Sequence, residues 1–450
     1  MSAVLVTAFL VAGLAAPLAG DAVDGDSGDG ELATQDAESP QAPRRLLVVD
    51  LDDLGWEFLN ESEIEEFTAL DEAARTYRNF HTAPLCSPTR SLMQMGAFGS
   101  HPDLLLGGLI REQGTFEMPT EGPLEPLAKV VSSSGRRTAK VGKWHLAPYT
   151  VSDHPNRAGW QDYVGVMGNT GGDAPFFRWA ETKNGVVTRG RTGYLTTAET
   201  DQALEFVERD VDLISVSYHA IHDPYHAPPK ELVGELDESG ETILARAMLR
   251  ALGRELARLT ERALERGYTI VVFSDNGALE VLGGAKGSLG QYGTLVPLWV
   301  LGPGVEPGED RSLVGAVDLY RTILEFFAIE ASPTRGPDSV SFLGTWKGEP
   351  GARELLFFER FDKNGVDPRL TPDRWGRAVR DERYLLMLTP HKPHQRLFDL
   401  DPRGRWGNLL RGKLAKEEQP HFERLRDELF RISRVPWPQA APTTPDDEND

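Results

Sequence analysis

The chain contains a single cysteine, Cys86, among its 450 residues. One cysteine cannot form an internal disulfide, so the fold must be stabilised mainly by its hydrophobic core. A lone thiol is more often a small buried hydrophobic side chain than a reactive group. The residues around Cys86 therefore have to distinguish a packing role from a chemical one.

Basic side chains are scarce relative to acidic ones, with 48 Lys and Arg against 69 Asp and Glu and a formal net charge of −21. Broad nucleic-acid binding needs a basic surface, so we exclude it. A few local cations can still hold a small anionic ligand. The remaining acidity is expected to keep an exported protein in solution. The length predicts one large domain plus a smaller one.

Long apolar runs are absent except at the N-terminus. Residues 1–19 form one apolar run that ends in small residues, although no Lys or Arg precedes it. This pattern predicts a signal peptide, with an N-terminal membrane anchor as the alternative, and no membrane insertion elsewhere. We therefore expect export to the periplasm or the extracellular space. Residues 20–44 and 441–450 are polar and predict a disordered linker and a disordered tail.

Short apolar runs alternate with helical patterns over residues 45–350, which predicts an α/β fold with a large, mostly parallel sheet sandwiched by helices. The expected strands are 45–50, 137–141, 211–218, 268–274 and 296–301. The expected helices are 124–134, ending before a left-handed Gly135, 196–207, opening with a capping box of Thr196 and Glu199, and 242–266. Residues 351–440 predict a smaller antiparallel sheet plus a helix, with strands at 354–358, 376–380, 383–388 and 397–400 and a helix at 417–432.

Charged and metal-binding groups follow four of the predicted strands. Ligands of open parallel sheets bind beyond the carboxyl ends of the strands, so these groups should meet at one edge. The oxygen ligands predict a site for a hard cation, Ca²⁺ or alternatively Mg²⁺, and are Asp52, Asp53, Asp275 and Asn276. The cationic and proton-transfer groups suit a tetrahedral anion held near such a metal and are Arg90, Lys143, His145, His222 and Lys286.

A family resemblance joins Cys86 to this set. Residues 86–90, Cys-Ser-Pro-Thr-Arg, resemble the Cys-x-Pro-Ser/Thr-Arg signature of type I sulfatases in the alkaline phosphatase-like superfamily. In that family a maturation enzyme oxidises the cysteine to formylglycine. Further blocks match in the family's order over about residues 45–410, namely Asp-Asp-Leu-Gly at 52–55, Gly-Lys-Trp-His-Leu at 142–146, His-Asp-Pro at 222–224, Ser-Asp-Asn-Gly at 274–277, Lys-Gly-Ser at 286–288, and Leu-Phe-Asp-Leu-Asp-Pro at 397–402 with Asn-Leu at 408–409. The ordered set is far more specific than the cysteine signature alone.

The resemblance implies a role for each matching residue. Asp52, Asp53, Asp275, Asn276 and the formylglycine made from Cys86 would hold the metal. The hydrated aldehyde would attack sulfur, and Arg90 would stabilise it. Lys143, His222 and Lys286 would bind the sulfate oxygens, with His222 or Lys286 protonating the leaving oxygen. His145 would take the proton from the second hydroxyl and so release sulfate.

Some positions depart from the family pattern. The family continues after its signature with Leu-Thr-Gly-Arg, whereas residues 93–97 are Met-Gln-Met-Gly-Ala. We expect conversion of Cys86 to be inefficient, or to require a maturation enzyme with different tolerance. Gln291 begins a Gln-Tyr-Gly run where the family often has Glu-Gly-Gly, and Leu295 replaces a common Arg. An unusual substrate is therefore expected.

Several residues rank lower as substrate contacts. A packing or surface role is an equal alternative for the three near the matching blocks, His81, Tyr225 and His226. Gln291 is a further candidate from the departing run. His391 and His394 are weaker candidates, and Trp144 is expected to pack between its reactive neighbours.

The sequence thus predicts a sulfatase that hydrolyses a sulfate ester, of a sulfated carbohydrate or another small molecule, after a maturation enzyme has modified Cys86. Two alternatives remain open. One is a phosphonate monoester hydrolase or phosphodiesterase of the same superfamily. The other is a catalytically inactive sulfatase-like protein that binds glycans.

Overall fold

The computed structural model describes residues 44–433, apart from 172–173, 237–239, 369–374, 390–394, 402 and 404–406. The predicted signal peptide at 1–19, almost all of the linker at 20–44 and the tail at 441–450 lie outside the described residues. His391 and His394 lie outside them as well. In the described part of the chain, no helix is both long and apolar enough to cross a membrane.

The main sheet has ten strands in the spatial order β11-β2-β10-β9-β1-β8-β4-β5-β6-β7. Its strands are β1 (Leu46–Leu51), β2 (Arg75–Tyr77), β4 (Thr138–Lys143), β5 (Asp162–Val166), β6 (Arg178–Lys183), β7 (Val186–Thr192), β8 (Leu213–Ser217), β9 (Thr269–Ser274), β10 (Leu298–Leu301) and β11 (Gly308–Asp310). The five central strands β9, β1, β8, β4 and β5 are parallel to one another. Strands β10, β6 and β7 are antiparallel. The predicted large, mostly parallel sheet is confirmed.

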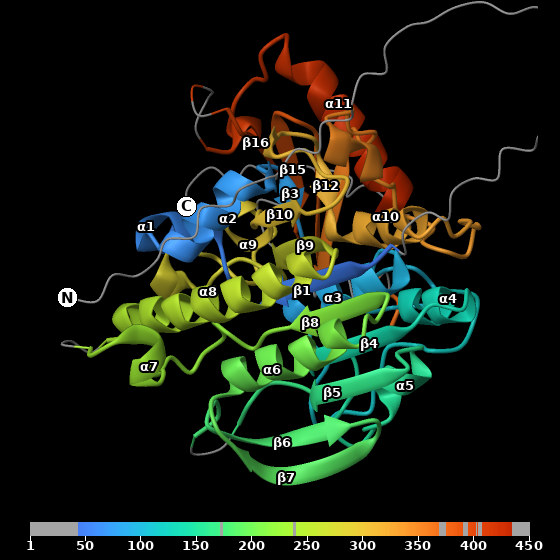
Figure 1. Ribbon diagram of the computed structural model, residues 1–450. Coiled ribbons are helices and arrows are strands. Elements are labelled where there is room, and N and C mark those ends of the chain that lie inside the picture. The colour runs from blue at the N-terminus through green and yellow to red at the C-terminus, as the bar shows by residue number, and fades with distance from the viewer. Residues whose placement is uncertain are drawn as a thin grey trace, which may run out of the picture. The chain divides into compact units, whose positions relative to one another are not determined.

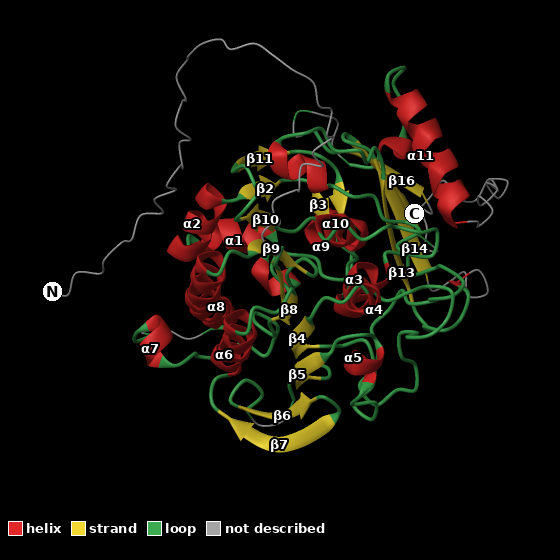
Figure 2. Ribbon diagram, turned by 45° about the vertical axis from the view of Figure 1, so that its right-hand side comes forward, coloured by secondary structure: helices red, strands yellow, loops and turns green. Residues whose placement is uncertain are grey.

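Helices cover both faces of this sheet (Figures 1 and 2). One face packs against α1 (Trp56–Ser62), α2 (Glu65–Ala73), α6 (Leu195–Glu208) and α8 (Glu241–Glu265). The other packs against α3 (Cys86–Met95), α4 (Leu127–Ser133) and α10 (Leu319–Phe326). The shorter elements are β3 (Phe80–His81), β12 (Val314–Gly315), α5 (His154–Arg157), α7 (Lys230–Val233), α9 (Gln291–Thr294), η1 (Glu280–Leu282), η2 (Ala316–Asp318), η3 (Leu343–Lys347) and η5 (Leu409–Arg411).

Apolar side chains on both sides of the central strands explain this layering. Strand β1 has the sequence Leu-Leu-Val-Val-Asp-Leu, and all six residues are buried. Strand β9 has the sequence Thr-Ile-Val-Val-Phe-Ser and is also completely buried. Continuous β-branched and aliphatic runs are typical of parallel strands that are covered on both faces. Because these strands are parallel, their carboxyl ends lie at one edge.

A smaller antiparallel sheet follows, made of β13 (Leu356–Phe361), β14 (Trp375–Arg380), β15 (Tyr384–Leu388) and β16 (Gln395–Asp399), with helix α11 (Glu418–Ser433). The predicted C-terminal sheet plus helix is confirmed. Phe357 on β13 contacts Phe98, with ring centroids 4.9 Å apart. Apolar packing therefore connects this sheet to the loop after α3.

Two predicted helix ends have different outcomes. Gly135 follows α4 with a φ of +86°, so the predicted left-handed stop is confirmed. The predicted capping box of Thr196 and Glu199 is wrong, because α6 begins at Leu195 after Tyr194 and has no side-chain cap. Glu199 lies inside the helix and is buried, where it makes a different contact that is described below.

Candidate active site

Four acidic and amide side chains meet at the carboxyl edge of the sheet. Asp52 and Asp53 directly follow β1, while Asp275 and Asn276 directly follow the neighbouring strand β9. One ligand atom from each of Asp52, Asp53, Cys86 and Asp275 lies within 4.8 Å of the other three. The structure therefore brings the sequence-predicted metal ligands together.

Cys86 is the first residue of α3 and is buried. Its Sγ lies 3.4 Å from Asp52 Oδ1 and 3.9 Å from Lys143 Nζ. The amino end of a helix favours a bound anion, because its first N–H groups have no partner within the helix. Burial, with the charges of Asp275 and Asp52, raises the pKa of the Cys86 thiol well above its ordinary value. These protein groups therefore favour a neutral thiol, which is a poor nucleophile.

The chemistry of the carboxylate cluster fits a divalent cation. Burial and the charges of Asp52 and Asp53 raise the pKa of Asp275 to about 7. Asn276 donates through Nδ2 to Asp53 Oδ1 at 2.6 Å, and its own buried Oδ1 has no hydrogen-bond partner among the described residues. A hard cation would neutralise the crowded carboxylates and use that free oxygen, as Ca²⁺ or Mg²⁺ does.

Three cationic side chains hold the carboxylates, of which Arg90 and Lys143 are buried and Lys286 is partly buried. Arg90 Nη1 lies 2.6 Å from Asp50 Oδ2, and its Nη2 donates to Asp275 Oδ2 at 3.0 Å. Lys143 Nζ forms an ion pair with Asp52. Lys286 Nζ lies 2.7 Å from Asp53 Oδ1.

These contacts control the pKa of Asp52. Burial opposes its ionisation, but Lys143, His222 and Arg90 hold the pKa of Asp52 well below the ordinary value. Carboxylates therefore orient the cationic side chains of the candidate site, and Lys143 also lies 3.9 Å from Cys86 Sγ.

The two predicted histidines lie in different settings. Burial and the charge of Lys143 hold the pKa of His145 well below its ordinary value, and its Nδ1 has no partner among the described residues. The neutral form of the His145 imidazole is therefore favoured. His222 Nδ1 donates to the Asp223 carbonyl at 2.7 Å, and its Nε2 lies 3.9 Å from Asp53 Oδ2. This geometry turns Nε2 of His222 toward the carboxylates.

The backbone at this edge is left-handed at three positions, with φ of +61° at Asp53, +55° at His145 and +85° at Gly142. Such values are uncommon outside glycine, although Asp and His adopt them more readily than most residues. A Cβ on Gly142 would lie 2.0 Å from the Ser217 carbonyl oxygen, so this position requires glycine. The close approach of β4 to β8 there positions Lys143, the next residue.

A second layer of polar residues lies beneath the site and was missed by the sequence analysis. Lys140 donates to Ser217, and its Nζ lies 3.6 Å from Asp50 Oδ1. Burial lowers the pKa of Lys140 to about 8, although Asp50 opposes this shift. Since Asp50 also contacts Arg90, this network supports the Arg90 side chain from inside the sheet. The signal available in the sequence was a charged residue inside each of two short strands, Asp50 in β1 and Lys140 in β4.

Glu199 belongs to this supporting layer as well. Its Oε1 lies 2.5 Å from His219 Nδ1, and both residues are buried. The other ring nitrogen, Nε2, lies 3.0 Å from the carbonyl oxygen of Gly168. Glu199 therefore orients His219 and, through it, the loop that follows β5.

The lower-ranked residues are distributed around the site. His81 is buried, with Nδ1 3.1 Å from Thr294 Oγ1, and Nε2 accepts a bond from Arg380 at 2.8 Å. Both ring nitrogens are engaged, which favours the packing alternative for His81. The His226 ring packs on Phe176 at 4.4 Å, which also favours packing.

Two further candidates remain near the site. Burial, followed by the charge of Asp53, raises the pKa of Tyr225 well above its ordinary value. The Tyr225 hydroxyl is therefore close enough to the site for the Asp53 carboxylate to act on it. Gln291 begins α9, whose loop is connected to the cysteine loop because the Gly287 amide donates to the Pro84 carbonyl at 2.8 Å. Trp144 is buried and donates from Nε1 to His154 Nδ1 at 3.1 Å, as expected for a packing residue.

The residues that depart from the family pattern after the cysteine signature pack in the hydrophobic core. Met93, Met95 and Ala97 are buried in the core that also contains Tyr320 of α10. Apolar packing explains why these positions carry no polar side chain. The predicted effect on maturation of Cys86 stays a prediction.

Comparisons with known proteins agree with this geometry. Residues 44–329 match the family model described as Sulfatase. The chain belongs to the sulfatase family. It is 34% identical to arylsulfatase G of Mus musculus over 155 residues, covering 31% of this chain and 27% of that protein. It is 25% identical to arylsulfatase J of Mus musculus over 302 residues, covering 59% of this chain and 49% of that protein. The chain thus spans half or less of the length of these relatives.

Solved structures share the fold at low sequence identity. Ps i-CgsB in complex with k-i-k-neocarrahexaose superposes with a TM-score of 0.74 at 19% identity, covering 87% of this chain and 93% of that one. PsFucS1 sulfatase from Pseudoalteromonas sp. superposes with a TM-score of 0.65 at 16% identity, covering 88% and 92%. The sheet, its helices and the small C-terminal sheet therefore form the architecture of sulfatase structures.

Proposed function

We propose that this protein hydrolyses a sulfate ester, using formylglycine made from Cys86 and a bound divalent cation. The observation that carries the proposal is the position of Cys86, which lies at the amino end of α3 between Asp52 and Lys143. A residue at this point can reach both a cation held by the carboxylates and an anion held by the lysines. The cysteine signature lies within the matched family region.

The residues around Cys86 have distinct chemical tasks. As formylglycine, residue 86 would supply a hydrated aldehyde, and a Ca²⁺ or Mg²⁺ ion held by Asp52, Asp53, Asp275 and Asn276 would supply positive charge for binding sulfate. Lys143 and Lys286 bind those oxygens and neutralise the charge that develops on them. His222 or Lys286 delivers a proton to the departing alcohol oxygen.

His145 completes the cycle by accepting the proton whose loss releases sulfate. Its low pKa keeps the imidazole neutral and therefore able to accept. General acid–base help of this kind contributes about 10²- to 10⁴-fold to a rate. Arg90 stabilises the hydrated aldehyde and holds the metal-ligand residue Asp275 in place, supported by its contacts with Asp275 and Asp50.

We propose a sulfated carbohydrate as the substrate. Support comes from structural neighbours, since one was solved in complex with k-i-k-neocarrahexaose and another with its substrate D-glucosamine-2-N,6-O-disulfate. The apolar run at residues 1–19 supports export to the periplasm or extracellular space, where such polymers occur. A maturation enzyme that generates formylglycine is the required partner.

The test combines mass spectrometry with a choice of substrates. The peptide containing Cys86 should carry the aldehyde in protein made together with a maturation enzyme, and turnover of 4-nitrophenyl sulfate should rise with the fraction converted. The Cys86→Ala variant, made in the same way, should show no turnover. Faster cleavage of bis(4-nitrophenyl) phosphate than of the sulfate would favour the phosphodiesterase alternative. A persistent thiol, with glycan binding but no turnover, would favour the inactive alternative.

A further inference from the structure

A cavity of about 700 Å³ lies beside the candidate active site, at the far end of the main sheet. This volume is in the range of small-molecule sites, about 300–1,000 Å³. Polar and aromatic side chains share its walls with aliphatic ones. The lining residues used below are Tyr149, Met167, Asn169, Trp179 and Arg189.

The wall of this cavity continues directly from the active-site backbone. Strand β5 lies next to β4, and Val166 at its end pairs in register with Lys143. Beyond the strands, the His145 amide donates to the Met167 carbonyl at 2.9 Å. Neighbouring strands lie about 4.8 Å apart, so the cavity begins about one strand away from the catalytic edge. Val166 and Met167 therefore belong both to the cavity wall and to the chain segment that adjoins the active-site edge.

The hairpin of β6 and β7 borders the cavity and is basic, although the whole chain is acidic. Residues 178–192 contain four basic side chains and one acidic one, in a protein of net charge −21. Arg191 lies 3.4 Å from Glu181, the one acidic residue. Arg178, Lys183 and Arg189 are exposed and form no ion pair with any described residue. The hairpin therefore carries free positive charge.

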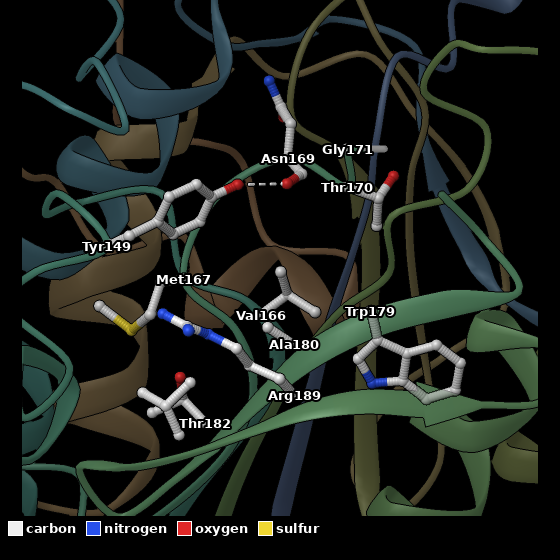
Figure 3. A pocket seen from close by; sticks show the side chains of 11 residues that line it. Tyr149, Val166, Met167, Asn169, Thr170, Gly171, Trp179, Ala180, Thr182 and Arg189 are labelled. Carbon is white, nitrogen blue, oxygen red and sulfur yellow. Dashed lines mark hydrogen bonds between the residues drawn. The ribbon is translucent and has the colours of Figure 1, made fainter. Parts of the chain in front are cut away.

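Arg189 is the member of this group whose side chain enters the cavity. Figure 3 shows it between Tyr149 on one side and Trp179 on the other, reaching toward Met167. The Tyr149 hydroxyl donates to the Asn169 carbonyl at 2.5 Å, which fixes the ring. A planar guanidinium binds a carboxylate or sulfate through two parallel bonds, and an aromatic ring offers a face for the apolar side of a sugar.

We infer that this cavity is a second sugar-binding subsite, which takes an anionic unit adjacent to the sugar whose sulfate ester is hydrolysed. Arg189 pairs with the sulfate or carboxylate group of that unit, and Tyr149 packs against its ring. The inference rests on the proposed function and narrows it. The substrate class is an oligosaccharide or polysaccharide with anionic groups on neighbouring units, rather than an aryl sulfate or an isolated monosulfated sugar.

The test separates the subsite from the reaction by using two kinds of substrate. Matured wild-type protein and the Arg189→Gln variant are assayed at physiological ionic strength with 4-nitrophenyl sulfate and with size-defined oligosaccharides of heparin, chondroitin sulfate and carrageenan. Arg178→Gln is the matched control, because Arg178 is an exposed arginine of the same hairpin that does not line the cavity. Binding of each oligosaccharide to the Cys86→Ala protein, with and without Arg189→Gln, is measured by calorimetry.

We expect at least one oligosaccharide to bind, and Arg189→Gln to weaken its binding and raise its KM by about tenfold or more, as the loss of a charge-assisted bond predicts. Arg178→Gln should change either value less than about twofold, since an exposed charge away from the ligand contributes little. Turnover of 4-nitrophenyl sulfate should be the same in all three proteins. A carboxylated but unsulfated oligosaccharide, compared with a sulfated one, identifies which anionic group Arg189 recognises.

Three results would overturn the inference. The first is equal weakening of oligosaccharide binding by Arg189→Gln and Arg178→Gln, which would indicate general charge attraction. The second is no effect of Arg189→Gln on the binding of any oligosaccharide. The third is failure of every oligosaccharide to bind. The proposed function fails separately, if matured protein does not cleave 4-nitrophenyl sulfate or any sulfated oligosaccharide while binding through Arg189 persists.

Discussion

Charged side chains occur in two contrasting settings in this molecule. At the carboxyl edge of β1 and β9 they are buried, and cations such as Arg90 and Lys143 contact carboxylates directly. On the hairpin of β6 and β7 the basic side chains are exposed, and Arg178, Lys183 and Arg189 have no ion-pair partner among the described residues. The same residue types therefore act under different physical constraints.

The two regions differ in the free-energy cost of removing one charged side chain. A buried charge that loses its partner stays unsolvated, which costs about 3–5 kcal/mol. An exposed pair contributes about 0–1 kcal/mol, because water and salt screen it. We therefore expect substitutions at the sheet edge to have large effects on folding or turnover. Substitutions on the hairpin should act only on ligands that contact it.

The largest effect should come from Asp53, which bonds Lys286 and Asn276 and belongs to the carboxylate cluster. Asp53→Asn should lower kcat of matured protein by about 10³-fold or more, because metal binding and charge stabilisation are both lost. In wild-type protein, chelation should abolish turnover and Ca²⁺ or Mg²⁺ should restore it. At a concentration 100 times its Kd, the ion should stabilise the protein by about 2.7 kcal/mol.

The matched control for Asp53 is Asp153→Asn, which changes an exposed aspartate whose Oδ1 lies 3.5 Å from Arg157. It should leave turnover and the ion-dependent shift in Tm unchanged. If Asp53→Asn kept the wild-type shift in Tm with added metal, the cluster would not be the metal site.

His145 should give the next largest effect. His145→Asn should lower kcat about 10²- to 10⁴-fold with little change in KM, since the general base acts after substrate binding. Asn is chosen because it tolerates the left-handed backbone at this position. His101→Asn, at a partly exposed histidine outside the site, serves as the control. A rise in KM as large as the fall in kcat would instead indicate a binding role.

A third test concerns stability rather than turnover. Burial lowers the pKa of His154 to about 4 from an ordinary value of 6.5. Between these values the unfolded chain binds more protons than the folded one, so stability rises with pH across this window. The contribution of His154 is complete above pH 6.5 and is lost as pH falls toward 4, by about 3 kcal/mol.

Unfolding by urea at pH 7.5 and pH 5 measures this contribution. His154→Gln should show a smaller loss of stability on acidification than wild type, whereas the His101→Gln control should keep the wild-type loss. Identical pH profiles for His154→Gln and wild type would show that buried His154 does not carry the effect.

Local patterns predicted the parallel strands and the site residues that follow them. Strand β1 is a short buried run, and Asp52 and Asp53 come directly after it, so both the strand and its ligands are visible within eight residues. The carboxyl ends of parallel strands share an edge, and this topological rule was enough to group Asp53 with Asp275.

The supporting layer depends on contacts that local patterns do not contain. Lys140 and Ser217 are 77 positions apart and meet only because β4 pairs with β8. Glu199 fits a capping box by its spacing from Thr196, yet in the fold it is the partner of buried His219. Tertiary contact outweighed the local preference at Glu199. For the same reason, the cavity lined by Arg189 could not be predicted, because three strands and two loops form it.

The smallest expected effect tests the other side of the comparison, the hairpin. Arg191 pairs with Glu181 at 3.4 Å, but Glu181 also accepts a bond from Gln202 Nε2 at 2.7 Å. Glu181 therefore keeps a partner when Arg191 is removed, and Arg191→Gln should cost less than about 1 kcal/mol in the free energy of unfolding. Urea unfolding at low and high salt measures this, and the small difference from wild type should shrink as salt screens the pair. If the free energy of unfolding fell by more than about 2 kcal/mol and salt did not reduce this loss, Arg191 would behave like the buried charges of the sheet edge. The distinction between the two regions would then fail.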